Sequence, residues 1–194
     1  MLAFAASILV LVSAFYNDLV RKREQKLQRE REILATKIML PETLFYLLAA
    51  YKELGELLAT IEDNNSEKIK EAADNLQLPN WVAEILVDTV RNSDIDDGEL
   101  IRKTMSNMQI LRARLSSLEL NSYNLIGRLY ETTVVSAQLI SILQYARNHT
   151  ASINEITADN VKHQLSSILS TKASDKPIYL GVLKRIDDAN SFNF

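Results

Sequence analysis

Hydrophobic residues follow two different patterns along this chain. From Leu2 to Tyr16 they form a run without a charged side chain, and Leu19 and Val20 extend it. Beyond residue 33 they recur at intervals of three and four, which is the spacing of one face of an α-helix. The first pattern predicts a helix that is apolar all round, and the second predicts amphipathic helices that bury one face in a core.

Prolines and polar turns divide the second pattern into segments. Each of the three prolines stands near the start of an apolar segment, where its missing N–H does no harm. We expect helices from Pro41 to the Asp63-Asn64-Asn65 turn and over residues 66–76, 80–92, 100–147 and 177–188, with a further helix that carries Val161, Leu165, Ile168 and Leu169. The long segment 100–147 has a possible break at Asn121-Ser122.

Helix starts and one buried helix can also be predicted. Asp96 or Asp97 is expected to cap the helix near residue 100, and Thr157 or Asp159 the helix after it. The stretch TTVVSAQLISILQYA has no charge, but it is too short to span a bilayer and contains two glutamines. We therefore predict that it forms the central helix of the domain, buried nearly all round.

Composition agrees with a helical protein. The 194 residues include only 4 Gly and 3 Pro, and 47% are hydrophobic. We predict an all-α fold with four parts: a single transmembrane helix (1–20), a charged juxtamembrane helical stem (21–40), a compact multi-helix bundle in the cytoplasm (41–188) and a C-terminal tail (189–194).

The charges around the first apolar run predict its orientation. A spanning helix needs about 20 apolar residues, and this run is followed by Arg21, Lys22, Arg23 and Lys26, with no Lys or Arg before it. The positive-inside rule then places the N-terminus outside and the rest of the chain in the cytoplasm. A signal peptide cleaved near Ala14 would need a basic n-region, which is absent. A helix buried within a large assembly remains an alternative.

One face of the first apolar run carries small residues at helical spacing. In lipid, small side chains let a second helix approach closely, so this face predicts a transmembrane partner or self-association. The face consists of Ala3, Ala6, Ser7, Val10, Ser13 and Ala14.

The basic stretch is a candidate contact for lipid headgroups. Residues 21–32 mix Lys and Arg with three Glu and contain no aromatic residue on which a base could stack. The net charge of the chain is −3, so nucleic acid is not expected as a partner. Anionic headgroups are the expected contact of Arg21, Lys22, Arg23 and Lys26.

No motif for catalysis, metal or cofactor binding is found. The chain has no Cys, and the acidic loop NSDIDDGEL would place Ser93 and Ile95 at ligand positions of a calcium loop. His149 and His163 lack the partners of a metal or phosphoacceptor site. No glycine-rich phosphate loop or nucleophile motif occurs. We expect no enzyme activity, no cofactor and no metal.

The sequence therefore predicts a function that depends on contacts with other proteins. We expect a membrane-anchored scaffold, adaptor or regulatory subunit of a membrane-bound assembly. The alternative is a structural subunit of a large particle or secretion-type machine, with its apolar helix buried against neighbouring protein. A lipid- or small-molecule-binding bundle would require a cavity among the helices.

Overall fold

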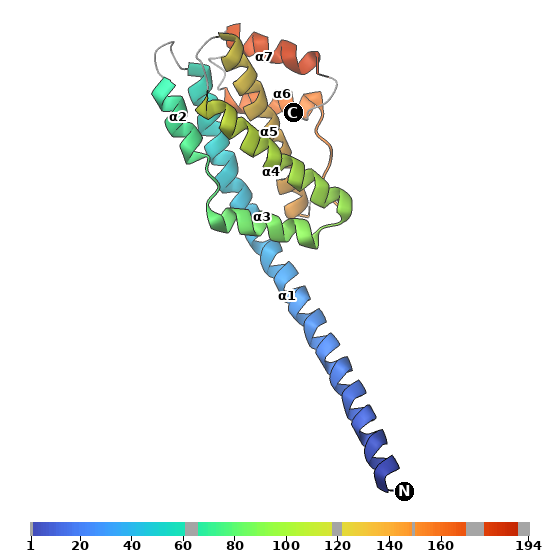
Figure 1. Cartoon of the computed structure of the whole chain (residues 1–194). Coiled ribbons are helices and arrows are strands. Elements are labelled where there is room, and N and C mark those ends of the chain that lie inside the picture. Colours follow the sequence, from blue (N-terminus) through green and yellow to red (C-terminus); the bar gives the residue numbers. More distant parts are fainter. Residues whose placement is uncertain (1, 61–65, 118–121, 149, 170–176, 190–194) are drawn as a thin grey trace. The chain divides into compact units, whose positions relative to one another are not determined.

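The computed structural model describes residues 2–60, 66–117, 122–148, 150–169 and 177–189, except for the side chains of residues 2–14, 66, 122 and 123. Within these ranges the chain is all-helical, as predicted, with seven helices and no strand (Figure 1). They are α1 (Leu2–Thr60), α2 (Ser66–Asn75), α3 (Asn80–Asn92), α4 (Ile95–Ser116), α5 (Ser122–Ala146), α6 (Ala158–Ile168) and α7 (Pro177–Asp187).

The chain divides into two units, Met1–Ile38 and Met39–Phe194. In the first unit, every described side chain from Phe15 to Glu32 is exposed. Its helix is supported by contacts along its own surface, such as the ion pair between Lys22 and Asp18, at 2.7 Å. Pairs of this kind stabilise a solvated helix by only a few tenths of a kcal/mol each.

The second unit has a continuous hydrophobic core, to which α1 contributes one face. The side chains that form this face are buried and recur at three- and four-residue intervals. They are Leu40, Leu44, Leu47, Tyr51, Leu54 and Leu58. By contrast Leu34 and Ile38, which continue the apolar pattern in the sequence, are 60% and 67% exposed.

Helix α5 is the central helix of the second unit, as predicted. It packs against α4, α6 and α7, while α4 also packs against α2 and α3. Residues 131–139 of α5 are all buried. The hydroxyl groups of Thr132, Thr133 and Ser136 donate hydrogen bonds to carbonyl oxygens four residues earlier, so their burial leaves no hydroxyl without a partner.

The prediction that a helix begins at Pro41 is wrong. Pro41 lies inside α1, which runs through it. A proline in a helix interior removes one hydrogen bond, here the one that would reach the carbonyl of Lys37. The apolar side chains on both sides of Pro41 nevertheless keep helical spacing, and Leu40 and Leu44 gain burial in the core when the helix continues.

The predicted single long segment is divided, since α4 ends at Ser116 and α5 is described from Ser122, while Asn121 of the predicted break lies outside the described residues. The predicted cap by Asp96 or Asp97 is wrong, because α4 begins before both of them with Asp94 at the N-cap position. The carboxylate of Asp97 instead accepts a hydrogen bond from the backbone N–H of Ile153, at 2.8 Å.

The start of α6 agrees with the prediction. Thr157 caps this helix through a capping box, in which its hydroxyl oxygen accepts from the backbone N–H of Asn160 and the Asn160 side chain accepts from the N–H of Thr157. The predicted turn at residues 63–65, His149 and residues 190–194 of the tail lie outside the described residues.

Candidate functional site

Helix α1 is the helix in the described part of the chain that is long and apolar enough to cross a membrane. Between Phe15 and Thr60 its most apolar window has a mean hydropathy of 1.5, and 22% of that window is buried. The charged residues up to Glu32 confine this window to the later part of α1, where Leu40, Leu44 and Leu47 belong to the core. Packing in the second unit accounts for these three leucines, whereas Leu34 and Ile38 of the same apolar stretch are exposed.

The earlier apolar run, residues 2–14, is helical in its backbone, and its side chains lie outside the description. This applies to the whole predicted helix-packing face, which is Ala3, Ala6, Ser7, Val10, Ser13 and Ala14. The transmembrane helix over residues 1–20 and its packing face therefore stay predictions.

The predicted headgroup contacts Arg21, Lys22, Arg23 and Lys26 are all exposed on α1. Lys22 forms its ion pair with Asp18, and the Nζ atom of Lys26 lies 4.0 Å from a carboxylate oxygen of Glu30. Since these ion pairs are solvated and weak, the cationic groups are available to an anionic surface.

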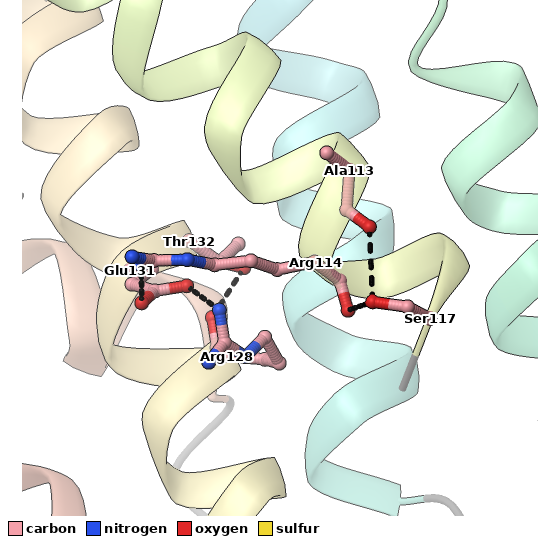
Figure 2. Close-up of polar contacts among 6 residues, drawn as sticks. All are labelled: Ala113, Arg114, Ser117, Arg128, Glu131 and Thr132. Atoms are coloured by element: carbon pink, nitrogen blue, oxygen red, sulfur yellow. Dashed lines mark hydrogen bonds and ion pairs between the residues drawn. The ribbon is translucent and has the colours of Figure 1, made fainter. Parts of the chain in front are cut away.

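A second group of charges lies inside the compact unit, around Glu131 of α5. Its carboxylate is 3% exposed and accepts from two guanidinium groups, Nη1 of Arg114 on α4 at 2.5 Å and Nη1 of Arg128 on α5 (Figure 2). A buried carboxylate is stable only when paired in this way. The two arginines come from different helices, so the ion pairs also connect α4 to α5.

Arg185 of α7 completes this group, because a glycine lets α7 approach α5 closely. A Cβ atom on Gly181 would lie 2.6 Å from Cδ1 of Ile126, so a larger residue there would force the Ile126 side chain to shift. The guanidinium carbon of Arg185 lies 5.0 Å from the ring centre of Tyr130, in a cation–π contact. We call Arg114, Arg128, Arg185 and Glu131 the arginine cluster.

The electrostatics of Arg128 reflect these neighbours. Burial lowers the pKa of its guanidinium group, Glu131 opposes this change, and the positive charges of Arg114 and Arg185 lower the pKa further. Arg128 therefore lies within electrostatic range of both other arginines. The cluster has three positive charges and one negative charge.

The arginine cluster was not predicted, although the sequence contains a signal for it. Arg128 and Glu131 are the only charged residues of α5, and they are three positions apart in a helix that is otherwise apolar or neutral. This spacing puts them on one face of the helix. Arg114 and Arg185 are distant in the sequence and are brought to this face by the packing of α4 and α7.

The second unit also has hollows on its surface. Two cavities of about 440 and 420 Å³ adjoin α3 and α4 and share Met105 and Gln109 in their walls. Within the described residues, no group of three or more His, Asp or Glu side chains is arranged to hold a metal ion. His163 is exposed on α6.

Comparison of the chain with protein-family models, with curated proteins and with solved structures gives no match.

Proposed function

We propose that this chain is a single-span membrane protein whose helical bundle acts in the cytoplasm as a scaffold, adaptor or regulatory subunit through protein contacts. The charge pattern of α1 carries the proposal. The uncharged residues 2–16 continue within one helix into residues 21–32, which are all exposed and contain six Lys or Arg side chains.

A bilayer accounts for both halves of this pattern. A helix satisfies its own backbone hydrogen bonds, so an apolar helix is stable in hydrocarbon, where about 20 residues are needed to cross. Tyr16 lies at the position of an interfacial aromatic residue, and the basic residues that follow favour the cytoplasmic side. Exposed Lys and Arg next to the span would also attract anionic headgroups.

Large apolar side chains on the surface of the second unit are evidence for the proposed contacts with other proteins. Trp81 is 42% exposed and stacks at a tilt on Tyr46, which is 44% exposed, with 5.6 Å between the ring centres. Ile95 is 86% exposed. Exposed aromatic residues are enriched where proteins bind other proteins.

Membrane fractionation of the full-length chain, with a reporter fused after Phe194, tests the proposal. We expect the protein to resist carbonate extraction and the reporter to be cytoplasmic. Deletion of residues 2–20 should move the protein to the soluble fraction, because the remaining chain keeps its own core. Release of the full-length protein by carbonate would contradict the proposal and favour the particle-subunit alternative.

Matched charge variants test the orientation. Changing Arg21, Lys22, Arg23 and Lys26 together to Gln should send part of the reporter to the opposite side, because the charge bias next to the span is reduced. Changing Lys68, Lys70, Arg91 and Arg102 together to Gln removes the same number of charges far from the span. This second variant should keep the reporter cytoplasmic, and equal behaviour of the two variants would contradict the proposed role of the basic stretch.

A further inference from the structure

Two hollows lie next to each other along α4 on the surface of the second unit. They have volumes of about 440 and 420 Å³, and the side chains of Met105 and Gln109 form walls of both. The facing walls belong to α3 and to residues 76–78, which connect α2 to α3. Because the hollows share walls they form one groove, which we call the α4 groove.

The wall that α4 provides has the spacing of a surface on which another helix packs. Five of its side chains recur at alternating intervals of three and four residues, and they are exposed or half-buried. Such alternation keeps side chains on one side of a helix, as in the seam of a coiled coil. From residue 102 to residue 116 this seam is about 21 Å long, or four turns. Its residues are Arg102, Met105, Gln109, Arg112 and Ser116.

The charged side chains in the walls of the groove are all cationic. Arg91 and Arg102 line the smaller hollow and Arg112 lines the larger one, and no Asp or Glu is among the described residues that line either hollow. Arg91 pairs with Asp88 at 3.1 Å and Arg102 pairs with Glu99 at 2.7 Å, both at solvated positions. Ion pairs of this kind are weak, so both guanidinium groups can also bind an anionic partner.

Arg112 is fixed in the wall by uncharged partners. Its Nε atom donates to the carbonyl oxygen of Ala73, at 3.2 Å, and its Nη2 atom donates to Oε1 of Gln77, at 3.3 Å. Both acceptors are neutral, so these bonds orient the guanidinium group without neutralising its charge. The walls of the groove are therefore complementary to an acidic partner.

An apolar side chain separates the cationic ends of the seam. Met105 lies between Arg102 and Arg112, which are about 15 Å apart along the axis of α4. Unbranched Met side chains adapt to the shape of an apolar partner. The partner that fits has an apolar surface with acidic groups near both ends. A fatty acid has its anionic group at one end only, whereas an amphipathic helix of four turns can carry one at each end.

We propose that the α4 groove binds an acidic amphipathic α-helix of a partner protein. The apolar face of that helix contacts Met105, and its acidic side chains pair with Arg102 and Arg112. An amphipathic helix in an apolar groove is a recurring mode of peptide recognition. This inference rests on the proposed role of the second unit in protein contacts, and it names the kind of segment that is bound.

A display library of helices about 18 residues long tests the groove. Each member has a fixed apolar face, and Glu, Gln or Lys varies at the other positions. The library is selected on the full-length chain in nonionic detergent micelles. We expect the selected helices to carry Glu near both ends of the apolar face, because the charged walls of the groove are cationic. Failure to select any helix, or selection of Lys as often as Glu, would overturn the proposal.

Charge variants, titrated with one selected helix and followed by fluorescence anisotropy, locate the binding site. Arg102→Gln combined with Arg112→Gln should weaken binding about tenfold or more, since each lost ion pair contributes up to about fivefold. Lys70→Gln combined with Lys103→Gln removes the same charge at exposed positions that do not line the groove, and should change the affinity less than about twofold. Equal affinities of the two double variants would overturn the proposal.

A conservative variant separates loss of charge from loss of structure. Arg112→Lys keeps the positive charge but lacks the guanidinium group that Ala73 and Gln77 orient. It should weaken binding less than Arg112→Gln does. Equal weakening by both variants would show that the charge of Arg112 is not what the helix recognises, which contradicts the proposed pairing.

Apolar variants test the middle of the groove. Met105→Gln should weaken binding about fivefold or more, because an apolar contact with the helix is lost. Ile95→Gln is the matched control, since Ile95 is 86% exposed on α4 and does not line the groove. Equal weakening by both would assign binding to apolar surface in general and overturn the proposal. Failure of the membrane anchor is distinguishable from either result, because carbonate extraction tests the anchor alone.

Discussion

At the scale of single residues, the buried hydroxyl of Tyr51 stands out among the polar atoms of the core. Its side chain is 1% exposed, and its hydroxyl has no hydrogen-bond partner among the described residues. The buried hydroxyls of Thr132 and Thr133 differ, because each donates to a carbonyl of its own helix. Within the described residues, the phenol of Tyr51 therefore contributes apolar packing but no hydrogen bond.

Replacing Tyr51 by Phe should raise the free energy of unfolding by about 1 kcal/mol, because the ring stays and an unpaired polar atom leaves the core. Urea unfolding of the full-length chain in mild detergent, followed by circular dichroism, measures this change. Tyr46→Phe is the matched control, since Tyr46 is exposed and its hydroxyl is not buried. A loss of stability in Tyr51→Phe alone would show that the hydroxyl has a partner.

The same variant should also change the response to alkaline pH. Burial raises the pKa of the Tyr51 phenol above its ordinary value, so the unfolded state loses this proton first. The stability is therefore complete below the unfolded pKa of about 10 and declines as the pH rises above it. Between about pH 9 and 11, the free energy of unfolding of Tyr51→Phe should therefore decline less than that of the original chain. The same urea series, repeated across this pH range, measures the difference.

Single residues show where sequence reasoning works and where it fails. The burial of Leu129 and its neighbours follows from apolar spacing, which depends on residues close together in the chain. The partners of Glu131 do not follow from it, since Arg114 belongs to another helix and only the packing of α4 on α5 brings the two together. Ion pairs between residues that are far apart in the sequence produce no local sequence pattern.

At the scale of helices, Pro41 is the residue where local and tertiary effects oppose each other. The local rule places a proline at the start of a helix, where no hydrogen bond is lost. In the structure α1 continues through Pro41, and Leu40 and Leu44 on either side are buried. Burial of two leucines is worth roughly 3–6 kcal/mol, which equals or exceeds the cost of about 3 kcal/mol for an interior proline.

Pro41→Ala should therefore stabilise the chain by roughly 1–3 kcal/mol, because alanine restores the hydrogen bond to the carbonyl of Lys37. The control is Pro79→Ala, at the N-cap of α3, where no helical hydrogen bond is missing and a loss of up to about 1 kcal/mol is expected. Thermal melts followed by circular dichroism compare the two variants. If Pro41→Ala destabilised the chain as Pro79→Ala does, Pro41 would be a helix start.

The predicted starts of α6 and α4 differ in outcome because the first depends on neighbouring residues and the second on a distant contact. The capping box of Thr157 and Asn160 lies within four residues, so the sequence contains all of it. The start of α4 was placed too late because Asp97 was interpreted as a cap, while its carboxylate binds the N–H of Ile153, which is 56 positions away.

At the scale of the whole molecule, the sequence predicted the helical class and the identity of the central helix. Both depend on periodicity and on the absence of charge over many residues, so errors at single positions average out. The arginine cluster depends instead on three helices that are distant in the chain. That is why the fold class could be predicted and the arginine cluster could not.

Association of whole chains is expected to depend on the small-residue face of α1. Enlarging Ser7 and Ala14 to Leu should reduce crosslinked dimer or bound partner in membranes by several-fold, because the backbones could no longer approach closely. Val12→Leu enlarges a residue off this face and should leave the yield unchanged. The original chain, the double variant and Val12→Leu should all insert into the membrane equally. Equal crosslinking in all three would mean that association depends on the second unit.

The late position of α5 in the chain has a consequence for synthesis. Its 25 residues begin at Ser122 and provide the surface on which α4, α6 and α7 pack. At about 5–20 residues per second, a ribosome needs roughly 5–20 seconds to pass from residue 20 to the start of α5. During this interval the apolar N-terminal run has already emerged while the core still lacks its central helix. If residues 2–20 are the anchor proposed above, a membrane-targeting factor would meet the chain before the second unit could fold.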